Sequence, residues 1–79
     1  MDTGLLWFDN DTRRGLAAKV DRAADHYRLK YGRKPSLCYV HPTMLSNGDG
    51  KLMAGPVEVR TAPWVMPNHF FIGENGRES

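Results

Sequence analysis

The sequence predicts an α+β fold in which one long helix packs on a small three- to four-stranded, mainly antiparallel sheet. Apolar residues first recur at intervals of three and four, and after Pro35 a two-residue alternation replaces that period. A chain of 79 residues, 41% apolar and 25% charged, has the length and composition of one globular domain. We therefore expect a single domain over residues 1–79, with loose ends at about 1–3 and 74–79.

The N-terminal half contains a short apolar run followed by the helix. Residues 4–8 read GLLWF, which fits an edge strand or an N-terminal tuck, and the DNDT segment that follows offers several helix N-caps. A helix is predicted over 12–31, because Gly32 is placed to end it and Pro35 opposes its resumption. Its apolar stripe comprises Leu16, Val20, Ala23, Ala24, Tyr27 and Tyr31.

The C-terminal half has the pattern of strands and turns. Strands are predicted at 37–41, 57–61 and 70–72, with a loop at SNGDGK (46–51) and an extended connection between Pro63 and Pro67. One helix covers only one face of such a sheet, so there is a single core. The strand residues expected to meet the helix are Tyr39, Val57, Val59, Phe70 and Ile72.

No spacing in the sequence is diagnostic of catalysis or of a metal site. The segment SNGDGK lacks the spacing of a phosphate-binding loop. Asp49 with Glu58 and Arg60 faintly suggests a nuclease metal site, but alternating charge on a surface strand explains the last two equally well. We expect no enzyme, no metal and no cofactor, with a metal-dependent nuclease as the least favoured alternative. The possible metal ligands, none paired at a ligand spacing, are His26, Cys38, His41 and His69.

The charge distribution allows a nucleic-acid-binding function. Residues 13–34 hold eight Lys or Arg against two Asp, a net of +6, whereas the rest of the chain holds three against seven, a net of −4. A basic row along the helix could follow a phosphate backbone, although a merely solvated helix face would look the same. The row consists of Lys19, Arg22, His26 and Lys30, extended by Arg33 and Lys34.

Large apolar side chains gather near the C-terminus. Strand alternation cannot bury both Phe70 and Phe71 on one face, so one of them faces out. An exposed aromatic beside Trp64 suits a protein partner, including a second copy of the chain. The favoured function is therefore a non-enzymatic interaction or structural module. Its partner-binding surface would comprise Trp64, Met66, Phe70 and Phe71.

The compartment follows from the cysteine content and the N-terminus. Cys38 is the only cysteine and forms no internal disulfide, and the first residues have no signal-peptide pattern. No apolar run approaches the about 18 residues of a membrane span. A cytoplasmic protein that does not bind membranes is expected.

The segment 16–74 resembles the C-terminal part of tailed-phage major capsid proteins. It has a helix ending HYRLKYGRKP, a strand running into CYVHPTML, a charged glycine turn NGDGK, and then AGPVEVRTAPWVMPNHFFIGE. The capsid proteins show the same order, with a "G-x-P-V" strand and a final strand closing on "V-G-D". This chain lacks their long spine helix, extended arm and extended loop. The resemblance implies a similar helix-on-sheet module of phage or prophage origin, not a shell-forming protein.

Overall fold

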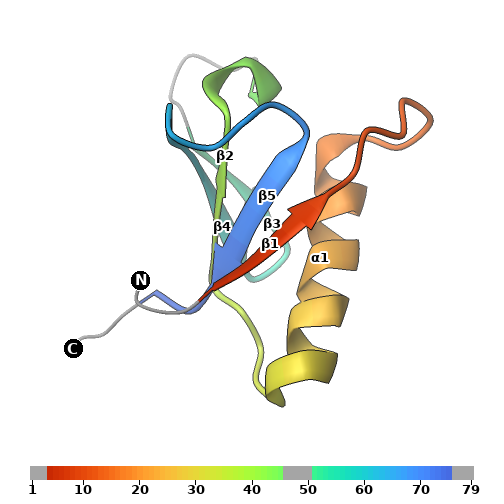
Figure 1. Ribbon diagram of the computed structural model, residues 1–79. Helices are drawn as coiled ribbons and strands as arrows, with labels where there is room; N and C mark the ends of the chain where they lie inside the picture. The colour runs from red at the N-terminus through yellow and green to blue at the C-terminus, as the bar shows by residue number, and fades with distance from the viewer. Residues whose placement is uncertain (1–3, 46–50, 76–79) are drawn as a thin grey trace.

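In the computed structural model, which describes residues 4–45 and 51–75, one helix lies across one face of a five-stranded sheet (Figure 1). The α+β class is thus confirmed. The elements in chain order are β1 (Gly4–Phe8), α1 (Leu16–Tyr31), β2 (Leu37–Val40), the short 3-10 helix η1 (Pro42–Met44), β3 (Lys51–Ala54), β4 (Val57–Thr61) and β5 (His69–Gly73).

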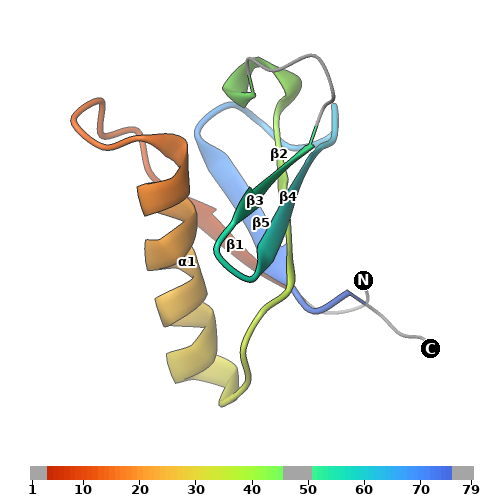
Figure 2. The ribbon, with the colours of Figure 1, turned by 180° about the vertical axis from the view of Figure 1, so that it is seen from behind.

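The sheet has more strands than the sequence predicts, and one pair of its strands is parallel. Its strand order is β1-β5-β2-β4-β3; β2 and β4 run parallel, and the other neighbouring pairs are antiparallel. The expected three- to four-stranded, mainly antiparallel sheet is therefore corrected to a five-stranded mixed one. The unpredicted strand is β3, which pairs with β4 at one margin of the sheet (Figure 2).

The helix starts later than predicted and ends where predicted. Its N-cap is Gly15, which has no side chain to cap the helix. The acidic residues before it form turns of their own: the Asp9 carboxylate accepts the Asp11 N–H at 3.0 Å, and the Asp11 carboxylate accepts the Arg13 N–H at 2.9 Å. At the other end, Gly32 adopts φ 75° and its N–H donates to the Arg28 carbonyl at 2.8 Å.

The core lies between α1 and the inner face of the sheet. Val20, Ala23 and Tyr27 supply the helix side, in agreement with the predicted stripe. The strand side includes four of the five predicted residues, Val57, Val59, Phe70 and Ile72, together with Cys38 and Val40. The prediction for Tyr39 is wrong, because its neighbours Cys38 and Val40 face the helix and alternation directs Tyr39 to the outer face.

Part of the expected loose C-terminus is fixed. Glu74 accepts a hydrogen bond from the Tyr27 hydroxyl at 2.9 Å and forms an ion pair with Arg33 at 2.9 Å. The Asn75 N–H donates to the Ser36 hydroxyl at 2.8 Å. The start of the predicted tail is therefore attached to α1 and to the segment before β2. The other residues expected to be loose, 1–3 and 76–79, lie outside the described residues.

A substitution at Gly32 tests the left-handed helix end. Gly32→Ala should lower the free energy of unfolding by about 1 kcal/mol, because a Cβ is strained at this positive φ. Gly32→Asn should cost less, since asparagine tolerates this conformation. Urea denaturation measures both variants. Equal stability of Gly32→Ala and the natural protein would contradict the helix end described here.

Acid should weaken the turn that precedes α1. The pKa of Asp9 is lowered by the hydrogen bond from the Asp11 N–H and by Arg14. A lowered folded-state pKa means that the stabilisation is present above the unfolded value, near 3.8, and is lost as the pH falls through the folded value. Asp9→Asn should therefore flatten the dependence of stability on pH below about 4. Urea unfolding between neutral and acid pH measures this, with exposed Asp21→Asn as control; an unchanged acid slope in Asp9→Asn would contradict it.

Candidate protein-binding surface

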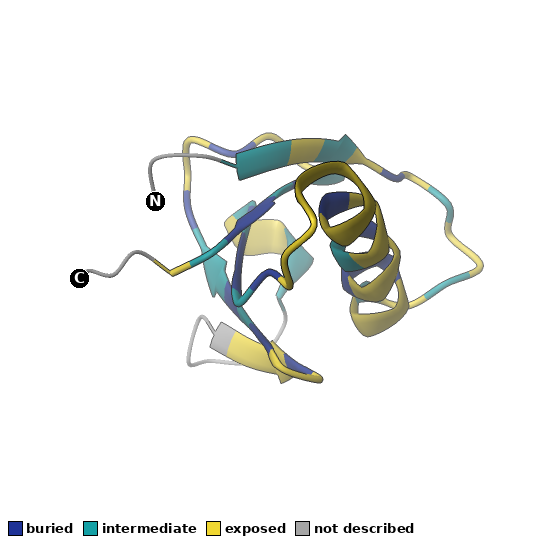
Figure 3. Cartoon of the chain, turned by 90° about the horizontal axis from the view of Figure 1, so that it is seen from below, coloured by how far each residue is buried: buried dark blue, intermediate teal, exposed yellow. Residues whose placement is uncertain are grey.

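The outer face of the sheet, opposite α1, carries a row of side chains in cross-strand register. Leu6 of β1 is opposite Phe71 of β5, Phe71 is opposite Tyr39 of β2, and Tyr39 is opposite Arg60 of β4. No helix among the described residues covers this face, because α1 packs on the other one (Figure 3). The outer face is covered in part by the connection between β4 and β5.

That connection places Trp64 over the sheet. It turns twice, with the Val65 N–H donating to the Ala62 carbonyl at 3.1 Å and the His69 N–H donating to the Met66 carbonyl at 3.1 Å. Val65 is buried at 3% exposure and anchors the segment. The segment is therefore a folded turn structure and not the extended connection predicted between Pro63 and Pro67.

Trp64 packs against two aromatic rings of the outer face. Its ring centroid lies 5.3 Å from that of Tyr39 and 5.7 Å from that of Phe71, the latter pair nearly perpendicular at 76°. Such edge-to-face contacts are favourable. Trp64 is nevertheless 63% exposed, so most of its surface remains available.

Beside Trp64 lies an open groove of about 350 Å³, here called the apolar groove. Leu6, Phe8 and Met66 surround the same region and are 61%, 54% and 66% exposed. Clustered exposed apolar side chains typically mark a binding site, whereas isolated ones do not. The groove has no Asp, Glu, Lys or Arg among its lining residues, which are Leu6, Trp64, Val65, Met66, His69 and Phe71.

Gly4 of β1 has no side chain, and the Phe71 ring occupies the space that a side chain there would need. A Cβ on Gly4 would lie 2.7 Å from Cζ of the Phe71 ring, closer than carbon atoms approach one another. The ring therefore lies directly over the backbone of the edge strand. Gly4 is thus needed for close packing at this margin of the sheet.

The structure brings together three of the four residues predicted for a partner surface. Trp64, Met66 and Phe71 share the outer face, as predicted. Phe70 is corrected: it is fully buried under α1 and belongs to the core. Sequence reasoning missed Leu6 and His69, as well as Phe8 at the rim. The alternation in GLLWF was a signal for the two β1 residues, because positions 6 and 8 share one face of a strand.

The predicted basic row is not continuous. Lys19 is only 7% exposed, and its ammonium donates to the Asp9 carbonyl at 3.4 Å. His26 stacks on Trp7 with ring centroids 4.1 Å apart, and Arg33 is paired with Glu74. Arg22 and Lys30 are exposed without an acidic partner among the described residues. The row is thus reduced to separated cations on the helix.

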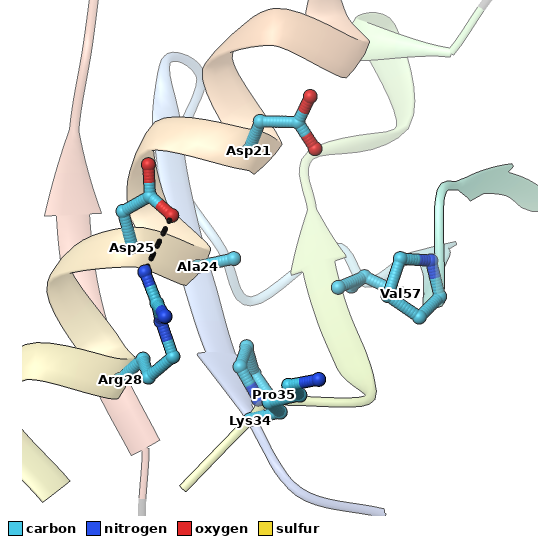
Figure 4. Close-up of a pocket in the computed structure, with 8 residues that line it drawn as sticks. Asp21, Ala24, Asp25, Arg28, Lys34, Pro35 and Val57 are labelled. Carbon is cyan, nitrogen blue, oxygen red and sulfur yellow. Dashed lines mark ion pairs between the residues drawn. The ribbon is translucent and has the colours of Figure 1, made fainter. Parts of the chain in front are cut away.

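Lys34 contributes to a second pocket of about 400 Å³, between α1, the segment before β2 and the β3–β4 turn (Figure 4). Its helical wall carries both acidic and basic side chains, and Asp25 and Arg28 form an ion pair there at 3.6 Å. Asp21 lies on the same wall, and the opposite side is formed by Pro35 and Val57. This mixture of charges interrupts the basic face further.

The residues considered for metal binding or catalysis lie apart. Over residues 4–45 and 51–75, no group of three or more His, Cys, Asp or Glu is placed to hold a metal ion. His41 Nδ1 accepts the Thr43 N–H at 3.2 Å and caps η1, while His69 Nδ1 donates to the Pro67 carbonyl at 2.9 Å.

Of the two acidic residues of the suggested nuclease site, the structure describes Glu58. Glu58 is held by Arg60 in a two-point contact of 2.7 and 3.2 Å. Asp49 and the rest of the predicted phosphate-loop segment lie outside the described residues, apart from Lys51 at the start of β3.

Comparison with protein-family models, with curated proteins and with solved structures finds no match to this chain. Within the described part of the chain, none of the helices has the length and apolar character needed to cross a membrane.

The Cys38 thiol should be unreactive in the folded protein. It is fully buried, and burial raises its pKa to about 12, so almost no thiolate exists near neutral pH. Labelling with a disulfide reagent at pH 8 should be at least about a hundredfold slower in buffer than in denaturant. Comparable rates in the two conditions would show that the thiol is accessible and would reopen a catalytic or metal-binding role for it.

Proposed function

We propose that this chain is a non-enzymatic interaction module that binds a protein partner through the apolar groove. The observation that carries the proposal is the clustering of exposed Leu6, Phe8, Trp64 and Met66 on the outer face of the sheet. Aromatic residues with large exposed area are the side chains that most often dominate binding energy at protein interfaces. The partner contributes apolar side chains, because the groove offers no fixed charge to pair with.

Nucleic-acid binding is the second candidate, supported by exposed Arg22 and Lys30 on α1. It is less favoured because Lys19 is buried, Arg33 is paired with Glu74, and Asp25 lies within the same helical surface. The His26 ring, which belongs to the basic row, is already stacked on Trp7, so that face of the ring is not available to a base.

A phage or prophage origin is part of the proposal. What supports this origin is the order of segments in the sequence: a helix, a strand, a glycine-rich turn, a strand and a final strand. The sequence resembles the C-terminal part of tailed-phage major capsid proteins in this order. Portal, protease and tail genes beside this gene would support the origin. Their absence from several independent genomes that carry the gene would argue against it.

Binding at the groove is tested with a peptide library. Random peptides displayed on phage are selected on the immobilised chain at high salt, where phosphate-type electrostatic binding is weak. We expect selected peptides to be rich in large apolar residues. Trp64→Ser should weaken the binding of a synthetic selected peptide at least about tenfold, as expected for an aromatic anchor.

Met53→Ser is the matched control, because Met53 is 60% exposed on β3 and lies away from the groove. Its peptide affinity should equal that of the natural protein in titration calorimetry. If no peptide is enriched, or if Trp64→Ser binds as well as the natural protein, the groove is not the binding site.

A gel-shift assay at low salt decides between the two candidates. With single- and double-stranded DNA and RNA as probes, we expect no tight complex. If a complex forms, weakens steeply between about 50 and 200 mM salt, and disappears when Arg22 and Lys30 are both replaced by Glu, the nucleic-acid function replaces the one proposed here.

A further inference from the structure

The edge of β1 lacks two features that protect many edge strands from pairing. β1 is at one end of the strand order, and among the described residues it pairs only with β5. Its sequence, GLLWF, contains no charged residue and no proline, both of which discourage pairing at an exposed edge. The other edge strand, β3, begins with Lys51 and is followed by the Gly55–Pro56 turn. Figure 3 shows β1 at the margin of the cartoon, with α1 and the other strands to one side of it.

The hydrogen-bond pattern identifies the residues of β1 whose backbone N–H and C=O groups point away from β5. The Asp9 N–H donates to the Asn68 carbonyl at 3.0 Å, in the same register that places Trp7 opposite Phe70. In an antiparallel ladder, alternate residues direct their N–H and C=O groups to the same neighbour. Leu5 and Trp7 therefore bond toward β5, and the groups of Gly4, Leu6 and Phe8 point to the free edge.

We propose that this edge pairs with β1 of a second copy of the chain, in antiparallel register with Leu6 opposite Leu6 on the two-fold axis. This register pairs all three outward-directed residues: Leu6 with its symmetry mate, and Gly4 with Phe8 twice. It joins the two sheets into one ten-stranded sheet with both α1 helices on the same side. The inference does not depend on the groove having another partner.

The side chains of β1 are complementary in this register. Phe8 of one copy faces Gly4 of the other, where the Phe71 ring lies over the glycine backbone, so the Phe8 ring comes to lie beside that aromatic ring. The pairing thus brings Leu6 and Phe8 of the two copies into contact, while Trp64 and Met66, which are 63% and 66% exposed, lie on the connection between β4 and β5 and not on the paired edge.

Among the described residues, the acidic one nearest to Leu6 is Asp9, three residues beyond it, so the two copies of Asp9 are about 20 Å apart along the paired strands. That separation exceeds the Debye length of about 8 Å at physiological salt.

Sedimentation and light scattering over a concentration series test the association. We expect a transition from 8.9 kDa to twice that mass. Leu6→Lys should raise the dissociation constant at least about tenfold, because it removes an apolar contact and places two like charges together at the axis. The matched control Met53→Lys changes an equally exposed residue on the other edge strand and should leave the dissociation constant unchanged.

Cysteine cross-linking tests the register. Opposed residues of a hydrogen-bonded antiparallel pair have Cα atoms about 5.5 Å apart, within the range of a disulfide. Leu6→Cys should therefore oxidise rapidly to a covalent dimer, whereas Met53→Cys should not; the buried Cys38 thiol does not interfere. A mass of 8.9 kDa at every concentration, or Met53→Cys cross-linking as fast as Leu6→Cys, would overturn the proposal.

The groove and the edge are separable by one variant. Trp64→Ser should weaken binding of apolar peptide at least about tenfold and leave the dimer intact. If the natural protein dimerises but binds no peptide, the groove proposal alone fails; if the natural protein binds peptide but stays monomeric at every concentration, the edge proposal alone fails.

Discussion

The alternation of side chains along β5 is the constraint on which both faces of the sheet depend. Phe70 and Ile72 point to α1 and are fully buried, while Phe71 between them points to the outer face. Because β5 is paired on both sides, with β1 and with β2, its register also fixes which residues of those strands face the helix. A one-residue slip would exchange the core and the aromatic surface. The core and the exposed aromatic surface are therefore set by the same three residues.

The elements that sequence reasoning found are those specified by local chemistry. Apolar spacing locates α1, and Gly32 locates its end because few other residues adopt positive φ without strain. The start of α1 was predicted too early. The preference of aspartate for N-cap positions suggested a start near residue 12, but the carboxylates of Asp9 and Asp11 accept backbone N–H groups within turns that precede the helix. β3 was missed because Lys-Leu-Met-Ala has neither alternation nor β-branched residues; its pairing with β4 is non-local. The parallel pairing of β2 and β4 likewise leaves no local signal.

The surface could be anticipated only in part. A cluster of aromatic residues near the C-terminus is visible in the sequence, and alternation requires Phe70 and Phe71 to face opposite ways. Which of the two is exposed depends on the position of α1, and that is a tertiary property. Leu6 joins Trp64 because β1 pairs with β5, across more than sixty residues of sequence. Lys19 is a case in which the sequence misleads. Its spacing places it in the basic row, but in the structure its side chain is buried and its ammonium donates to the Asp9 carbonyl.

The pairing of the first strand with the last has a consequence for biosynthesis. At roughly 5–20 residues per second, a ribosome completes β5 several seconds after β1. Throughout that interval β1 has no partner on either side, because β5, its one neighbour among the strands that the structure describes, has not been made. GLLWF is then an apolar, uncharged strand with two unsatisfied edges, the kind of segment that chaperones bind and that aggregates when it is not protected. The nascent chain is thus most vulnerable during the interval before its final strand is completed.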